Sequence, residues 1–182
     1  MKNQIHSFQM DSHLEGGFFC GYASVFDVVD HHREVIAPEA FTKSLKRWQQ
    51  RRQWPKLLWQ HDMTKPIGFW KCLRVDQTGL YVEGQLLLDI QQAREAYTLL
   101  KSGVLDGLSI GFRPIQSRRD ARVNARVIEE VDLLEISLVT FAANPAAKVT
   151  AVKERTHAPH GAGVLQHLIE CLRSCEREGS MP

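Results

Sequence analysis

Residues 127–142 read VIEEVDLLEISLVTFA, a long segment rich in Val, Ile, Leu and Phe that is followed by Asn144 and Pro145. A run of this kind bounded by turn residues is typical of a β-strand. Residues 104–112, VLDGLSIGF, predict a second strand. A break is expected at Pro114, because proline has no amide hydrogen to donate to a ladder. The sequence therefore predicts two strands in this part of the chain.

Two helices are expected beside the strands. Apolar residues recur at helical spacing over residues 38–50 and predict a helix with one apolar face. Asp89 and Gln92 have the spacing of a capping box, and Gly103 is typical of a helix end, so a second helix is expected over 90–102. Further strands are expected at 17–25, 57–60, 66–75 and 80–88, and a loop at 28–36.

The order of these elements predicts the fold class. Roughly six strands and two helices without regular β-α-β alternation favour a mainly β fold with peripheral helices (α+β), arranged as an antiparallel barrel or sandwich. Residues 1–16 are expected to form an N-terminal arm, and residues 17–153 the folded domain. Residues 154–182 should hold a Pro- and Gly-containing linker and a C-terminal amphipathic helix.

The composition excludes several classes of protein. The 182 residues include 23 Lys and Arg and 21 Asp and Glu, a formal net charge of +2, and 43% are hydrophobic. These values are typical of a soluble globular protein and exclude disorder for the bulk of the chain. No apolar run reaches the ~18 residues of a membrane span, and residues 1–11 lack the core of a signal peptide. The chain is therefore not expected to cross or enter a membrane. It is expected to be synthesised in the cytoplasm.

The cysteines give little indication of a metal site. The four cysteines have no paired metal-binding spacing. His167, Cys171 and Cys175 would share one face of a helix, where simple packing and a soft-metal site are the alternatives. Packing is the expectation, so neither a metal nor a cofactor is predicted.

Ser109 is a candidate nucleophile. Residues 107–111, GLSIG, have the G-x-S-x-G pattern of hydrolases. The strand-to-helix elbow of that pattern is not expected here, because Pro114 follows and α/β alternation is lacking. In a strand, Gly107, Ser109 and Gly111 would share a face cleared of side chains, where a peptide carbonyl could approach. The alternative is a strand serine between two packing glycines.

A serine nucleophile needs a base and a group that orients the base. Of the eight histidines, His61 is the one expected at the end of a buried strand, in LLWQH. Glu135 lies in LLEISLV, on the expected face of Leu133, Ser137 and Val139. An ionised carboxylate among apolar residues is costly unless a cation pairs with it. His61 is the expected partner, and a salt bridge to an arginine is the alternative.

Two other functions are compatible with the sequence. Ser109, Asp132 and His157 follow the nucleophile-acid-histidine order of a small esterase, in which His61 would be dispensable. Two basic clusters would suit a non-catalytic module that binds scaffold or nucleic acid. Charge runs are usually solvated faces, so nucleic acid is not the expected partner. The clusters are Lys43, Lys46, Arg47, Arg51, Arg52 and Lys56, and Arg113, Arg118, Arg119, Arg122 and Arg126.

Five segments, in the same order, resemble the prohead proteases of tailed bacteriophages. They are GYASVF at 21–26, VIAPEAF at 35–41, LLWQHD at 57–62, LDGLSIGF at 105–112 and LLEISLVTFAANPAA at 133–147. The resemblance spans residues 17–153. It implies an assemblin-like β-barrel ringed by helices, related to the capsid maturation protease of herpesviruses. Residues 27–33 differ from the Asp- and Gly-rich run of the family.

The resemblance also implies residue roles and a biological setting. His61 would be the general base, Ser109 the nucleophile and Glu135 the third catalytic residue, a position for which Asp132 is the other candidate. Backbone amides near residues 142–144 would bind the oxyanion. The implied enzyme is a serine endopeptidase packaged inside the procapsid in the cytoplasm of the bacterial host. It would cut a scaffold protein or the scaffolding segment of the major capsid protein, and itself near residues 154–182; homo-oligomerisation is left open.

Overall fold

The computed structural model describes residues 16–153. Its elements in chain order are β1 (Phe18–Val25), β2 (Glu34–Ile36), α1 (Thr42–Gln50), β3 (Lys56–Trp59), β4 (Asp62–Val75), β5 (Gly79–Leu86), α2 (Gln91–Lys101), β6 (Gly107–Asp120), β7 (Ala125–Val139) and β8 (Val149–Val152). The mainly β class with two helices is confirmed. The expected N-terminal arm up to residue 15 and the tail over 154–182 lie outside the described residues.

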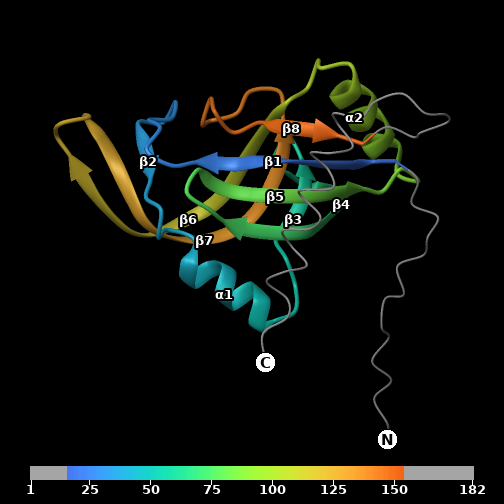
Figure 1. Cartoon of the computed structure of the whole chain (residues 1–182). Coiled ribbons are helices and arrows are strands. Elements are labelled where there is room, and N and C mark those ends of the chain that lie inside the picture. Colours follow the sequence, from blue (N-terminus) through green and yellow to red (C-terminus); the bar gives the residue numbers. More distant parts are fainter. Residues whose placement is uncertain (1–15, 154–182) are drawn as a thin grey trace, which may run out of the picture.

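The strands form one mixed sheet in which β7 is the organising strand. The hydrogen-bonded order is β2-β7-β3-β4-β5-β1-β8, and β6 also pairs with β7. β2 and β3 run parallel to β7, at residues 126–128 and 135–138 of β7, whereas β6 runs antiparallel along almost its whole length. In Figure 1 the distal half of the β6–β7 hairpin projects to the left of the other strands. The long strand expected from the sequence therefore holds the fold together.

The sheet is open and contains two parallel pairings, so the antiparallel barrel or sandwich expected from the sequence is wrong. β2 and β8 are the ends of the paired order. In residues 16–153, β6 and the segment before β8 are joined only by an isolated bridge between Gly107 and Lys148. The ladder does not continue because residues 140–146 form bends and a turn around Pro145, and the four residues of β8 pair with β1.

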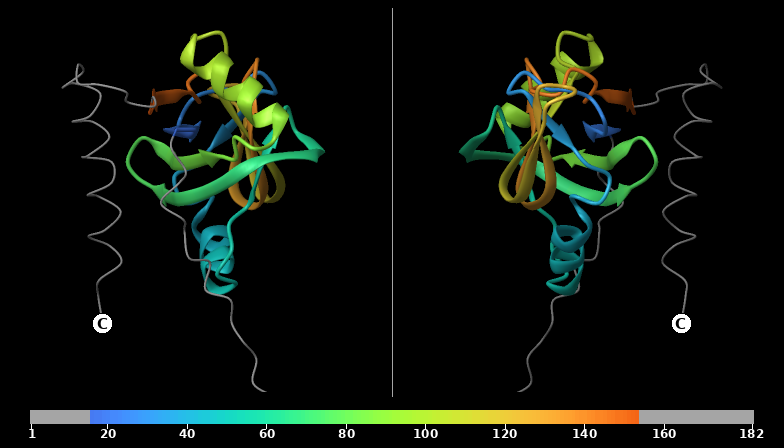
Figure 2. Two further views of the ribbon diagram at one scale, coloured as in Figure 1. Left: turned by 90° about the vertical axis from the view of Figure 1, so that its right-hand side faces the viewer. Right: turned by 90° about the vertical axis from the view of Figure 1, so that its left-hand side faces the viewer.

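The two helices lie on different sides of the strands. Figures 1 and 2 show α1 below the strands and α2 above them. α1 packs against β7, where Trp48 Nε1 donates to the carbonyl of Leu133 at 2.9 Å, and α2 packs against β4 and β5. α2 begins after Ile90 without a side-chain cap, so the expected capping box is wrong. Within residues 16–153, no helix is long and apolar enough to cross a membrane.

Two strand expectations also differ from the structure. Pro114 does not break β6, which continues to Asp120 with Pro114 opposite Val131. Proline is tolerated there because β6 pairs with β7 alone among the described strands, so its outer edge needs no donor. Residues 34–36, expected in a loop, form β2 by parallel pairing with β7. Strands as short as β2 and β8 carry too little periodicity to be recognised from sequence.

Candidate active site

The β6–β7 ladder gathers the candidate catalytic residues on one face. Ser109 lies directly opposite Ser137, and Gly111 lies directly opposite Glu135. Because side chains alternate along a strand, the intervening residues point the other way, and Ile136 is fully buried in the hydrophobic core. The core-facing side anchors the two strands and leaves the polar side for the site.

A β-bulge at Leu134 changes the expected face of Leu133. The register steps from Gly111↔Glu135 to Phe112↔Leu133, so Leu134 has no partner on β6. Leu134 is 39% exposed, whereas Leu133 is fully buried. The expectation that Leu133 shares a face with Glu135 is therefore wrong, because the bulge shifts the alternation by one residue.

His61 lies in a two-residue turn that joins β3 to β4. Trp59 pairs with Asp62, and the two residues between them, Gln60 and His61, have φ angles of 52° and 60°. Positive φ at both positions is the type I′ geometry of tight hairpins, and it costs roughly 1–2 kcal/mol for each residue that is not glycine. Gln60 Nε2 donates to Thr140 Oγ1 at 2.8 Å and ties the turn to the end of β7. The His61 imidazole is therefore carried by a turn whose backbone is strained but is held in place by this hydrogen bond.

The His61 imidazole is paired with the Glu135 carboxylate. Nδ1 of the ring lies 2.7 Å from Oε1 of Glu135, and Ser137 Oγ donates to Oε2 at 2.6 Å. The Glu135 side chain is 13% exposed and that of His61 43%. Because Nδ1 faces a carboxylate, the neutral ring carries its proton there and leaves Nε2 as an acceptor. The expected partnership is present, and the alternative salt bridge from Glu135 to an arginine is absent from residues 16–153.

Ser109 and His61 line the same pocket. The pocket has a volume of about 650 Å³ and also includes residues 141–144. Ser109 is 6% exposed, and within the described part of the chain its hydroxyl makes no hydrogen bond. The structure therefore brings the nucleophile and the base to one pocket without joining them. Hydrogen bonds of this kind often tighten only when substrate is bound.

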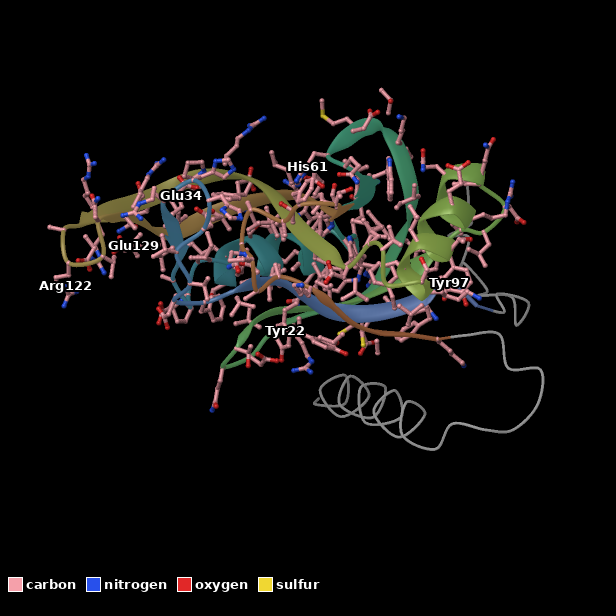
Figure 3. All side chains as sticks on the ribbon, turned by 90° about the horizontal axis from the view of Figure 1, so that it is seen from above. Tyr22, Glu34, His61, Tyr97, Arg122 and Glu129 are labelled. Atoms are coloured by element: carbon pink, nitrogen blue, oxygen red, sulfur yellow. The ribbon has the colours of Figure 1, made fainter. Side chains whose placement is uncertain are left out.

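Several residues of β6 line the pocket, so the β6–β7 hairpin marks its location. Figure 3 labels His61 beside the part of the hairpin that lies within the body, and Arg122 and Glu129 on the projecting part. The loop after β7 is held by hydrogen bonds from His31 N to the carbonyl of Ala143 at 3.0 Å and from Asn144 Nδ2 to the carbonyl of Val25 at 2.8 Å. Residues 142–144 therefore line the pocket in a fixed loop, and their role as oxyanion donors stays a prediction.

The esterase arrangement gains no support from this geometry. The Asp132 carboxylate forms an ion pair with Arg47 of α1 at 3.0 Å, and Asp132 does not line the pocket of Ser109. His157 lies outside the described residues. Asp132, the acid that the esterase hypothesis requires, is therefore paired with Arg47 instead of a histidine.

The two basic clusters are partly neutralised by acids. In the first, Lys43 pairs with Glu130 at 2.6 Å. In the second, hydrogen bonds from Arg122 and Arg118 hold the pKa of the Asp120 carboxyl well below its usual range. Non-specific binding of nucleic acid depends on cations that can neutralise phosphates. Carboxylates interleaved with the cations argue against a nucleic-acid-binding module.

Gly111 has a role that the sequence did not reveal. A Cβ atom built on Gly111 would overlap Oε1 of Glu135. The clearing on this strand face, expected to admit a peptide carbonyl, is therefore occupied at Gly111 by the carboxylate that contacts His61. Gln60 and Ser137, which also contact the site, carry no motif. Only the strand register, which places Gly111 opposite Glu135 and Ser109 opposite Ser137, could have indicated the contacts of Gly111 and Ser137.

The chain is similar to phage capsid proteins and proteases. The family described as caudovirus prohead serine protease matches residues 6–161. The chain is 33% identical over 138 residues to the prohead protease of Enterobacteria phage HK97, a match that covers 75% of this chain and 60% of the relative. It is 31% identical over 140 residues to the capsid polyprotein of Pseudomonas phage PAJU2, covering 69% of this chain and 21% of the relative. This chain thus spans less than two thirds of the length of these relatives.

A solved structure with a similar fold is the capsid assembly protease of bacteriophage T4. The two superpose with a TM-score of 0.53 at 12% sequence identity, over 68% of this chain and 83% of that chain. At this identity the likeness concerns the fold alone.

Proposed function

Because the chain belongs to the family of caudovirus prohead serine proteases, we propose that it is a serine endopeptidase of phage capsid maturation. The observation that carries the proposal is the contact of 2.7 Å between His61 Nδ1 and Glu135 Oε1, with Ser109 and His61 in one pocket. These are the base, the orienting acid and the nucleophile that a serine hydrolase requires. The resemblance of the five sequence segments further supports a distant relationship in fold to herpesvirus assemblin.

In the proposed reaction, Ser109 Oγ attacks the carbonyl carbon of the scissile peptide while its proton moves to His61 Nε2. The Glu135 carboxylate stabilises the imidazolium through Nδ1. His61 then gives the proton to the leaving amine, the C–N bond breaks, and an acyl group remains on Ser109. A water molecule deprotonated by His61 hydrolyses this ester and releases the new carboxyl terminus. The amides of residues 142–144 are the proposed donors to the oxyanion.

The proposed substrates are capsid proteins. They are a scaffold protein or the scaffolding segment of the major capsid protein, cut inside the procapsid in the bacterial cytoplasm. The names of two relatives, prohead protease and capsid polyprotein, support this setting. A pocket of about 650 Å³ is large enough to hold several atoms of an extended peptide on either side of the scissile bond.

The experiment that tests the function is co-expression with the neighbouring capsid gene product, followed by mass spectrometry of both proteins. New termini in the capsid protein are expected with the wild-type chain and not with Ser109→Ala. New termini that are identical with both versions would assign the cleavage to a host protease.

The same experiment tests self-cleavage of the tail. The linker sequence around Pro159 predicts a cut within residues 152–164, and an active enzyme should be required for it. Cleavage should be faster when the chain is concentrated inside a shell than in dilute solution. An intact C-terminus at Pro182 in mature particles would remove this part of the proposal.

Gly111→Ala is expected to lower kcat/KM for peptide cleavage by about ten- to a hundredfold, because the added methyl displaces the Glu135 carboxylate from His61. The rate should be measured on protein whose folded fraction is known from a melting curve. The matched control is Gly103→Ala at the end of α2, where φ is +70° and no heavy atom lies within 4 Å of an added Cβ. This control strains the backbone without contacting the site. An equal loss of activity per folded molecule in both variants would contradict the role of Gly111.

A further inference from the structure

Ser137 is a fully buried polar residue whose hydroxyl contacts both the acid and the base of the site. Ser137 Oγ donates to Glu135 Oε2 at 2.6 Å and accepts from the backbone N–H of His61 at 3.1 Å. A hydroxyl has one proton to donate and lone pairs to accept, so both bonds are satisfied at once. None of the reaction steps described above uses this side chain.

These bonds form a closed set of contacts that begins and ends at His61. The ring of contacts runs from the His61 amide to Ser137 Oγ, on to Glu135 Oε2, and back from Glu135 Oε1 to His61 Nδ1. It ties the imidazole to the backbone of the same residue through two side chains of β7. Rotation of the imidazole away from Glu135, or relaxation of the turn at Gln60 and His61, would break at least one of these bonds.

The turn needs such support because its conformation is unfavourable. Gln60 and His61 both have positive φ angles, and neither is a glycine or asparagine. The amide side chain of Gln60 holds the first half of the turn to Thr140. Ser137 holds the second half, at the residue that carries the imidazole. Strain of this kind persists at functional sites when the surroundings hold it in place.

We propose that Ser137 is a positioning residue, which fixes both the Glu135 carboxylate and the left-handed turn so that His61 Nε2 faces Ser109. The inference rests on the proposed function. Ser137 itself contacts no substrate and exchanges no proton with it. The competing interpretation is an ordinary buried serine that satisfies one backbone amide.

The chain contains a control that is matched to this interpretation. Ser44 of α1 is also fully buried, and its Oγ accepts from the backbone N–H of Leu133 on β7 at 2.9 Å. It contacts neither Glu135 nor His61. Ser44→Ala therefore removes a buried hydroxyl and leaves one amide of the sheet region without its acceptor, as Ser137→Ala does, without disturbing the ring of contacts.

The first test measures the rate at which an alkyl fluorophosphonate modifies Ser109. In this reaction Ser109 Oγ bonds to phosphorus, the P–F bond breaks and fluoride leaves, while His61 takes the hydroxyl proton. Ser137→Ala should slow the modification about ten- to a hundredfold, and Ser44→Ala should not. In a Glu135→Gln background the further effect of Ser137→Ala should be smaller than in the wild type, because the part of that effect that acts through the carboxylate is already lost. Equal rates for Ser137→Ala and Ser44→Ala, or full multiplication of the two effects, would overturn the proposal.

The second test does not depend on activity. The ¹⁵N resonances of the His61 ring should report a neutral tautomer protonated at Nδ1 in the wild type and in Ser44→Ala. Ser137→Ala should shift the ring towards the tautomer protonated at Nε2, and Ser137→Cys, which fills the space with a weaker donor, should lie between them. An unchanged tautomer in both Ser137 variants would overturn the positioning role. If the fluorophosphonate left Ser109 unmodified in the wild type, the proposed function would fail, and the tautomer measurement would still decide the role of Ser137.

Discussion

Replacement of Ser109 by alanine is expected to lower peptide cleavage by about 10⁴- to 10⁶-fold. Without Oγ there is no atom to form the acyl bond, and water in the pocket recovers only a small part of the rate. The hydroxyl makes no hydrogen bond within residues 16–153, so its removal should change the melting temperature little. The measurement is the cleavage rate of the capsid protein by the purified chain, with a melting curve on the same preparation.

Ser44→Ala separates the loss of a nucleophile from the loss of a buried serine. Its hydroxyl accepts the hydrogen bond from Leu133 N, so the control should lower the melting temperature and keep the activity of each folded molecule. Cleavage by Ser109→Ala at the wild-type rate, with host proteases excluded, would remove Ser109 from the mechanism.

Glu135→Gln is expected to lower turnover by a factor of up to about 10⁴ with little loss of fold. The amide keeps the shape of the side chain and can still accept the hydrogen bond from Ser137. It carries no charge to stabilise the imidazolium that forms as Ser109 attacks. A carboxylate with a purely structural role would give the reverse result, a lower melting temperature with activity retained. Melting temperature and cleavage rate on one preparation decide between the two.

Asp132→Asn is the matched control for this change. Asp132 lies on the same strand but pairs with Arg47 at 3.0 Å, on a surface where an ion pair contributes roughly 0–1 kcal/mol. Its loss should therefore leave turnover unchanged. Full activity in Glu135→Gln, together with a collapse in Asp132→Asn, would transfer the catalytic role to Asp132.

The elements around the site could be predicted because their signals are local. The apolar run over β7 and the glycines around Ser109 indicated two strands, and the position of His61 at the end of a buried strand followed from LLWQ before it. The cost of burying a carboxylate indicated that Glu135 needs a partner, and in the structure that partner is Nδ1 of His61. The mainly β class followed from the number and order of such segments.

The arrangement of these elements depends on long-range pairing, which the sequence does not display. A bulge at Leu134 decides which face of the strand Leu133 occupies, and no residue type in this segment indicates the bulge. The left-handed turn at Gln60 and His61 lacks the Gly, Asn or Asp that usually indicates such geometry. Whether the sheet closes depends on how far pairing extends beyond the single bridge between Gly107 and Lys148, a contact between segments about 40 residues apart in sequence.

The central claim is that Ser109 is the nucleophile and His61 its base. The most direct test is to treat the full chain with an alkyl fluorophosphonate and locate the modified residue by peptide mass spectrometry. We expect one adduct, on Ser109, which is absent from Ser109→Ala and forms much more slowly in His61→Ala. An adduct on a different residue, or cleavage of the capsid protein that continues after Ser109 is fully modified, would contradict the account.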